Sequence, residues 1–152
     1  MDPSYDQNLL ARILLTVMTA GYGLATVKAD FNRTHATNPL WTPHARFHVV
    51  WQILSYVGFG LIAFALIWIP GPFYVERLYL VCAFGLVVYG AFFVTFLAMP
   101  IYGGKPYDEN GYLPFAVNVF GRKLELDLNA TAFSVFFVVL IAGALIIRRG
   151  VS

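Results

Sequence analysis

Four long apolar runs, separated by polar or proline-containing segments, dominate the pattern of hydrophobic positions along this chain. They lie at about residues 8–29, 43–69, 73–99 and 129–149. Each run is on the order of 20 residues long, the length that an α-helix needs to cross the hydrocarbon core of a bilayer. The pattern predicts an all-α membrane protein, a four-transmembrane-helix bundle that forms a single domain over residues 1–152.

Local signals set the expected ends of these helices. Pro43 suits the first turn of the second helix, because the missing N–H of a proline is no loss there. The sequence Pro-Gly-Pro at residues 70–72 breaks the chain after that helix. We expect the third helix to end before Pro100 and Asn129 to be the N-cap of the fourth.

The connection between the third and fourth helices predicts a small β-hairpin. Residues 115–119 precede a break at residues 121–123, and residues 124–128 then alternate strictly between apolar and polar side chains, which is the period of a strand. Such a hairpin must lie outside the bilayer, because its backbone edges would be unpaired in lipid. We expect it to cover a mouth between the first and second helices.

An even number of spans puts both termini on one side of the membrane and both long connections on the other. A count of Lys and Arg alone puts the long connections in the cytoplasm, whereas Arg148 and Arg149, directly after the last apolar run, favour termini on the cytoplasmic side. The acidic start and the lack of a small-residue cleavage site indicate that the first helix is retained rather than removed as a signal peptide. We expect a multi-pass protein of the bacterial inner membrane.

The composition supports this class and narrows the partners. The chain is 59% hydrophobic and only 12% charged, whereas soluble domains carry about 25% charged residues. The net charge is +2 and no basic arm is present, which argues against a nucleic-acid partner. The expected partners are membrane lipids, a lipophilic small molecule, and either another membrane protein or further copies of this chain.

The three histidines all lie in one segment, which predicts a polar pocket between the first two helices. His44, His48 and Gln52 follow one another at spacings of four and stack along one face of the second helix. The first helix carries a stripe of small and polar residues at the same period, typical of a packed helix interface in membranes. The stripe consists of Thr16, Thr19, Gly23, Thr26 and Asp30.

Two kinds of chemistry fit this pocket. Asp30, His35, His44 and His48 are candidate catalytic residues, because an imidazole can exchange a proton near neutral pH. The same four side chains form a candidate ligand set for a divalent metal ion such as zinc, iron or copper. The alternative is that these histidines only hydrogen-bond to loop carbonyls and lipid headgroups.

Four further residues are candidates for substrate binding: Asn32, Arg46, Gln52 and Tyr89. Each has a simpler interpretation, since asparagines close turns and arginines extend to the membrane interface. Tyr89 lies in the middle of the third helix and needs a partner for its hydroxyl. The phenylalanines of the third and fourth helices are interpreted mainly as lipid-facing or packing residues.

Residues 30–48, DFNRTHATNPLWTPHARFH, resemble a signature in a family of small bacterial and fungal membrane proteins that has no assigned activity. The resemblance is confined to this block and implies a shared site there. In size and layout the chain is also similar to the sterol isomerase and sigma-2 receptor group, which implies a pocket for a sterol or a lipophilic amine. Isomerases of that group use a histidine and intramembrane glutamates, whereas the first, second and fourth helices here contain no glutamate.

The sequence thus favours a small membrane enzyme that acts on a lipophilic substrate by acid–base or metal chemistry. The alternative is a non-enzymatic accessory subunit that binds a lipid, a pigment or a partner within a larger membrane complex.

Overall fold

The computed structural model describes residues 8–151 and contains four long helices and one β-hairpin. The first long helix has three parts, and three further helices follow. In chain order the helical elements are α2 (Leu9–Ala20), the π-helical turn η1 (Gly21–Ala25), α3 (Thr26–Asp30), α4 (Pro43–Trp68), α5 (Tyr74–Tyr102) and α6 (Leu128–Val151).

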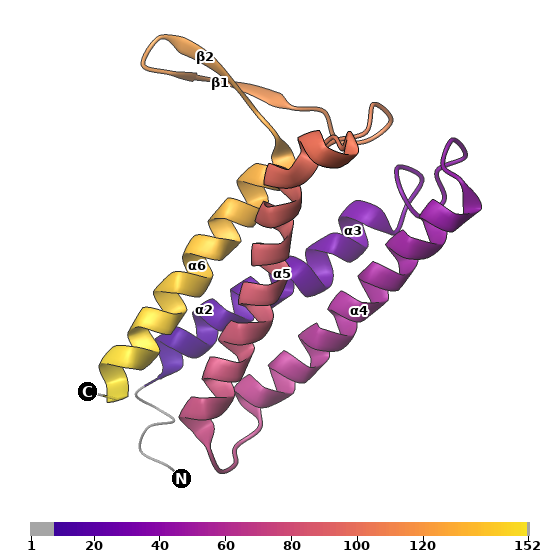
Figure 1. The fold of residues 1–152 in the computed structure, drawn as a ribbon. Coiled ribbons are helices and arrows are strands. Elements are labelled where there is room, and N and C mark those ends of the chain that lie inside the picture. Colours follow the sequence, from indigo (N-terminus) through magenta and orange to yellow (C-terminus); the bar gives the residue numbers. More distant parts are fainter. Residues whose placement is uncertain (1–7, 152) are drawn as a thin grey trace.

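The prediction of four membrane-spanning helices is confirmed. The described residues contain four helices that are long and apolar enough to cross a membrane. Their spans are Leu9–Asp30, Pro43–Trp68, Tyr74–Tyr102 and Leu128–Gly150. The beginning of α2 and the end of α6 lie at one end of the bundle, and both long connections lie at the other (Figure 1). The chain is therefore a multi-pass membrane protein with both long connections on one face.

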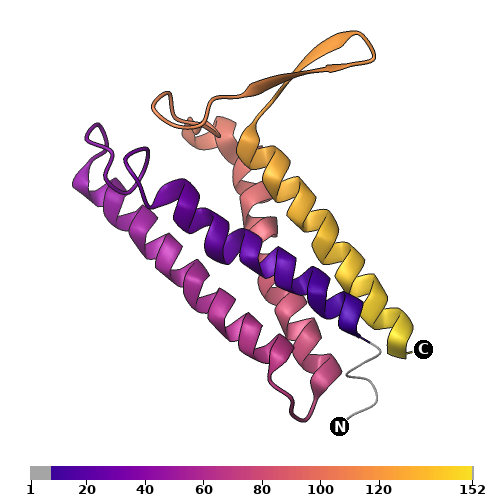
Figure 2. The same ribbon diagram turned by 180° about the vertical axis from the view of Figure 1, so that it is seen from behind.

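The four helices are not parallel along their whole length. The first helix begins against α6 and ends beside α4, and Figures 1 and 2 both show α4 and α5 diverging toward the end that carries the long connections. Near the opposite end, only five residues separate α4 from α5 and hold them together. The bundle consequently opens between its two halves at the loop end.

A contact between two glycines fixes the approach of the first helix to α4. A Cβ atom added at Gly60 would lie 3.5 Å from the Cα atom of Gly23. Thr19, from the predicted stripe, is buried beside this contact. Small residues let helix backbones approach closely in a membrane, where dispersion contacts rather than hydrophobicity drive association. The stripe of the first helix is thus a packed interface, as the sequence indicated.

Two predicted helix ends are wrong by a few residues. Pro100 lies inside α5, which continues to Tyr102 and ends at Gly103 in the left-handed conformation (φ 68°). A proline this close to the C-terminus of a helix is tolerated, because the helix ends only two residues later and the one backbone hydrogen bond that the proline cannot donate lies in its last turn. The N-cap of α6 is Asp127 and not Asn129, since the Asp127 carboxylate accepts the N–H of Ala130 at 2.8 Å.

The predicted hairpin is confirmed, but its turn and its position differ from the expectation. Strands β1 (Phe115–Val119) and β2 (Arg122–Leu126) pair in antiparallel fashion around a turn at Phe120 and Gly121, both with positive φ. Neither strand lines the cavity described below, and the hairpin projects away from α4 (Figure 1). Only Asp127 separates β2 from α6, so the start of that helix sets the direction of the hairpin.

Candidate functional site

A cavity of about 620 Å³ occupies the open end of the bundle. All four long helices and the segment after α5 contribute to its lining. One side, here called the polar wall, consists of Thr26, Asp30, His35 and Gln52. The opposite side, here called the aromatic wall, consists of Phe92, Phe96, Phe133 and Phe136. The volume lies within the range of small-molecule sites in proteins, about 300–1,000 Å³.

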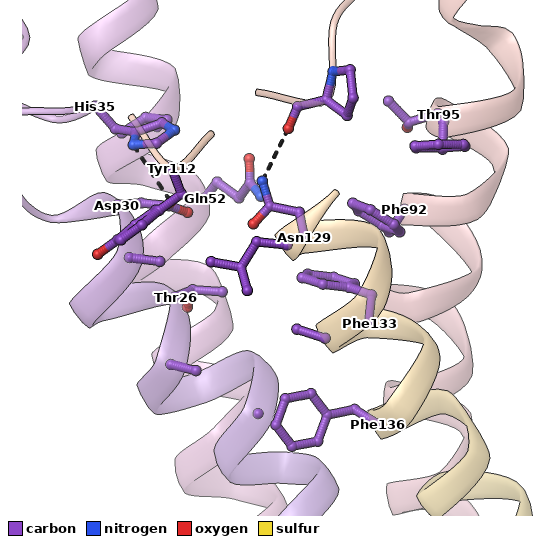
Figure 3. Close-up of a pocket in the computed structure, with 18 of the residues that line it drawn as sticks. Thr26, Asp30, His35, Gln52, Phe92, Thr95, Tyr112, Asn129, Phe133 and Phe136 are labelled. Atoms are coloured by element: carbon purple, nitrogen blue, oxygen red, sulfur yellow. Dashed lines mark hydrogen bonds and ion pairs between the residues drawn. The ribbon is translucent and has the colours of Figure 1, made fainter. Parts of the chain in front are cut away.

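The aromatic wall is held by ring contacts between α5 and α6. The rings of Phe92 and Phe133 stack with centroids 4.1 Å apart. Tyr89 lies behind the wall, where its ring stacks against Phe136 at 6.2 Å and its hydroxyl donates to the Met18 carbonyl at 2.6 Å. Tyr89, predicted to bind substrate, does not line the cavity but supports the rings that do. The phenylalanines interpreted as lipid-facing or packing residues are instead part of the site (Figure 3).

A smaller cavity of about 210 Å³ adjoins the first between α4 and α5. Gln52, Phe92, Thr95 and Phe133 line both cavities, and Tyr56 completes the smaller one. The side chains of Gln52 and Thr95 are exposed on the surface of the bundle. The space inside the bundle therefore extends toward the gap where α4 and α5 diverge.

Asn32 organises the loop that follows the first helix. Its amide nitrogen donates to the carbonyls of Lys28 and Ala29 at 2.9 and 2.8 Å, and so closes the end of α3. Its amide oxygen accepts the N–H and the hydroxyl of Thr34 at 2.7 and 2.6 Å. All the contacts of Asn32 are thus internal, and it does not line the cavity. This predicted substrate-binding residue shapes the loop and positions its neighbours.

The same hydrogen bonds assign the tautomer of His35. Both N–H groups of the Asn32 amide donate to carbonyls, so the amide oxygen is the atom that faces Thr34. The single hydroxyl proton of Thr34 is therefore donated to the Asn32 amide oxygen. The Thr34 hydroxyl oxygen, 2.7 Å from Nδ1 of His35, must then accept. Nδ1 of His35 carries the proton, and Nε2 carries the lone pair of the neutral ring.

Asp30 lies beside this histidine (Figure 3). Its carboxylate oxygen is 3.7 Å from Nδ1 of His35, on the side of the ring that Thr34 already holds. Within residues 8–151, no side chain or backbone group hydrogen-bonds to Nε2. The histidine is therefore anchored at one nitrogen and available at the other, with a carboxylate near enough to stabilise a positive ring.

His44 and His48 do not join this group. Their Nε2 atoms lie 3.0 Å apart and both rings are exposed, and neither residue lines the cavity. Helix geometry explains the difference, because a step of four residues turns by about 40° beyond a full circle. Gln52 reaches the rim of the cavity, and each step back to His48 and His44 rotates the side chain further out.

The predicted four-ligand metal set is consequently not assembled. In the described part of the chain, no group of three or more His, Cys, Asp or Glu side chains is placed to hold a metal ion. Asp30 and His35 form one pair at the cavity, and His44 and His48 form another on the outside of α4. A polar pocket near Asp30 is present, but the described residues do not bring the four predicted ligands together.

Arg46, another predicted substrate-binding residue, also stays out of the cavity. Its side chain is half-buried, and its Nε atom has no hydrogen-bond partner in the described residues. Several lining residues were not singled out from the sequence, among them Lys28, Lys105, Tyr112 and Asn129. They come from segments far apart in the chain, so no local spacing could have grouped them.

Two hydrogen bonds tie the long connections to the rest of the site. Nε1 of Trp41 donates to the Asp108 carboxylate at 3.1 Å, and the Trp41 ring packs edge-on against His35 with centroids 5.1 Å apart. The Asn129 amide donates to the Pro106 carbonyl at 3.0 Å (Figure 3). The second connection is thereby held over the cavity, and its contact with Trp41 also steadies the histidine.

This link makes a prediction about pH. The backbone N–H of Asn110, followed by the Trp41 indole, lowers the pKa of Asp108 below its usual range. A depressed pKa means that the link contributes at neutral pH and is lost as the pH falls through that lower value. Trp41→Phe should raise the pKa of Asp108 but leave it below about 3.9, since the Asn110 contact remains. Carboxyl carbon NMR titration of both proteins in micelles measures this shift, and an unchanged Asp108 pKa would show that the indole contact is absent.

The site thus combines an anchored imidazole, a nearby carboxylate and an aromatic wall within one cavity. Five expected site residues are placed elsewhere or act through neighbours: Asn32, His44, Arg46, His48 and Tyr89. Comparison of the chain with family models, characterised proteins and solved structures found no match.

Proposed function

We propose that this protein binds a lipophilic small molecule from the bilayer and acts on it by acid–base chemistry at His35. One observation carries the proposal. The imidazole of His35 lines the cavity opposite the aromatic wall. Its Nδ1 is protonated and held by Thr34, and its Nε2 has no hydrogen-bond partner among the described residues. The proposal therefore depends on two properties of one cavity, an apolar binding surface and a group that can move a proton.

The aromatic wall supports the choice of a lipophilic molecule. Phenylalanine side chains present large apolar faces, and ligand sites are lined mainly by such groups with a few polar ones that orient the ligand. The smaller cavity between α4 and α5 supports uptake from the side, because two of its lining residues, Gln52 and Thr95, are exposed where these helices diverge. A substrate that lives in the bilayer would not have to cross water to reach His35.

The hydrogen-bond chain supports acid–base chemistry. In the proposed step, Nε2 of His35 accepts a proton from the substrate, and the ring becomes positively charged. Thr34 holds Nδ1, and Asp30 at 3.7 Å stabilises that charge. A base that is oriented by a second group is the arrangement found in many enzymes that use histidine. Asn32 acts through Thr34 and is a positioning residue.

The same proposal places the protein in a bacterial inner membrane. The four spans place the protein in a membrane, and the resemblance of residues 30–48 to a bacterial and fungal family favours a bacterial inner membrane. That resemblance covers both Asp30 and His35, so it also supports a shared site at this end of the bundle.

The proposed binding is tested by filling the cavity. Ala132 lines the cavity on α6, and Ala132→Trp should occupy the space in front of the aromatic wall. We expect a lipophilic molecule to copurify in about equimolar amount with the native protein and to fall below a tenth of that amount with this variant, because buried contact area is lost. Mass spectrometry of organic extracts from protein purified in mild detergent gives the measurement.

Ala91→Trp is the matched control. Ala91 is exposed on α5 and does not line the cavity, so a tryptophan there should leave the copurified molecule in place. Identical extracts from all three proteins would contradict the proposed binding.

A second candidate function is an accessory subunit. The outer face of α4 favours it, because His44, Phe47, His48 and Trp51 are exposed together and none lines the cavity. Aromatic residues are enriched at protein interfaces. A subunit should purify with a stoichiometric membrane partner that His48→Ala or Trp51→Ala releases, whereas the proposed enzyme should purify alone.

A further inference from the structure

Two lysines at the loop end of the cavity lack an acidic partner. Lys28 lies in the last turn of the first helix and Lys105 lies shortly after α5, and both line the cavity with exposed side chains. Among residues 8–151, neither lysine is close enough to a carboxylate to form an ion pair. The carboxylate in the lining, Asp30, is already beside His35 at 3.7 Å. The lining at the loop end of the cavity therefore carries two ammonium groups that no carboxylate pairs with.

The interior of the same cavity is apolar. Phe92 and Phe133 stack at 4.1 Å, and Phe96 and Met99 extend this surface along α5. A molecule that fills both regions needs an apolar body for the aromatic wall and a negative group for the lysines. Lysine ammonium groups bind carboxylates and phosphates through charge-assisted hydrogen bonds.

We infer that the natural ligand is a single-chain amphiphile of the bilayer with an anionic head group, a carboxylate or a phosphate monoester. The inference rests on the proposed function and names the substrate class of that site. The head group lies between Lys28 and Lys105, and the chain lies against the aromatic wall. A single chain is chosen because a cavity of about 620 Å³ falls in the small-molecule range. The head group is held near His35, which lines the same end of the cavity.

The inference is tested by displacement of a fluorescent fatty acid. cis-Parinaric acid is bound to the purified protein in dodecyl maltoside, and the Ala132→Trp variant supplies the background from micelles. Dodecanoate, dodecyl phosphate and dodecanol are the competitors, so that chain length is constant and only the head group changes. We expect an anionic competitor to displace the probe at least tenfold more effectively than the alcohol. The order of dodecanoate and dodecyl phosphate then identifies which anion the site prefers.

Charge removal at the cavity provides the second arm. Lys28→Gln and Lys105→Gln should each weaken the anionic competitor about tenfold, since a hydrogen bond to a charged group is lost. Lys123→Gln is the matched control, because Lys123 is exposed on β2 at the same membrane face and does not line the cavity. The affinity of Lys123→Gln for the anionic competitor should equal that of the native protein. The affinity of the lysine variants for dodecanol should also remain unchanged.

Two results would overturn the inference while leaving the proposed function intact. One is equal displacement by dodecanol and the anions, which would indicate a neutral ligand. The other is an equal loss of affinity in Lys123→Gln, which would indicate general attraction to a positive surface. A different result would reject binding in the cavity and the proposed function with it. In that case cis-parinaric acid would bind equally to the native protein and to Ala132→Trp, and the lipid extracts of the two proteins would be identical.

Discussion

Replacing His35 with alanine is expected to lower the rate of the proposed reaction by about two to four orders of magnitude, the usual contribution of a general acid–base group. The reason is that Nε2 of His35 is the proton acceptor, and no other imidazole in the described chain lines the cavity. His48→Ala should leave the rate unchanged, since that ring is exposed on the outside of α4. Both proteins are placed in nanodiscs of bacterial polar lipid extract, and mass spectrometry follows the lipids over time.

Thr34→Val tests the orientation of His35 separately. The variant keeps a side chain of similar shape but removes the oxygen that accepts Nδ1–H at 2.7 Å. We expect a smaller loss of rate than for His35→Ala, while the copurified ligand is retained. Full activity of His35→Ala, with a folded protein confirmed by circular dichroism, would reject the acid–base role. A native protein that retains a ligand without converting any lipid would favour binding without catalysis.

Replacing Gly60 with leucine is expected to destabilise the bundle by about 3 kcal/mol, the upper part of the usual range for overpacking. The Cβ atom of the new side chain would already lie 3.5 Å from the backbone of Gly23. The remaining atoms of the leucine could fit only if α4 moved away from the first helix. Reversible unfolding in mixed micelles with increasing sodium dodecyl sulfate measures the change in the free energy of unfolding.

Gly58→Leu is the matched control on the same helix. No atom lies within 4 Å of a Cβ atom built at Gly58, so the side chain has open space. Leucine also has a higher helix propensity than glycine, by about 0.8 kcal/mol, so this variant should be neutral or slightly more stable. Equal destabilisation by both substitutions would mean that the glycine contact does not hold the two helices.

Several features of the site could be predicted because they depend on neighbours in the chain. The spacing of Gly23, Thr26 and Asp30 placed these residues on the inner face of the first helix, where the structure has them. The turn residue Asn32 closes the end of the first helix with bonds to carbonyls three and four residues back. Such interactions are local, so the residues that make them are visible in the sequence.

Other features could not be predicted, since they depend on how segments far apart meet. His48 has the right spacing to Gln52, but four residues turn a helix by more than a full circle. Gln52 therefore lies at the rim of the cavity while His48 lies outside it. Lys105 and Phe133 line the site beside Lys28 only because three helices and a loop converge there. The pair of lysines at the cavity is a property of this convergence and of no single segment.

The sequence by itself determined the membrane class, the number of long helices and the hairpin, because these follow from the length of apolar runs and from the period of alternation. It also identified Asp30 and His35. Only the tertiary structure decided that Asp30 and His35 are separated from His44 and His48. It also decided that phenylalanines of α5 and α6 face this pair across a cavity. The physical reason is the divergence of α4 from α5, which is set by the contact between Gly23 and Gly60 and by the crossing of the first helix from α6 to α4.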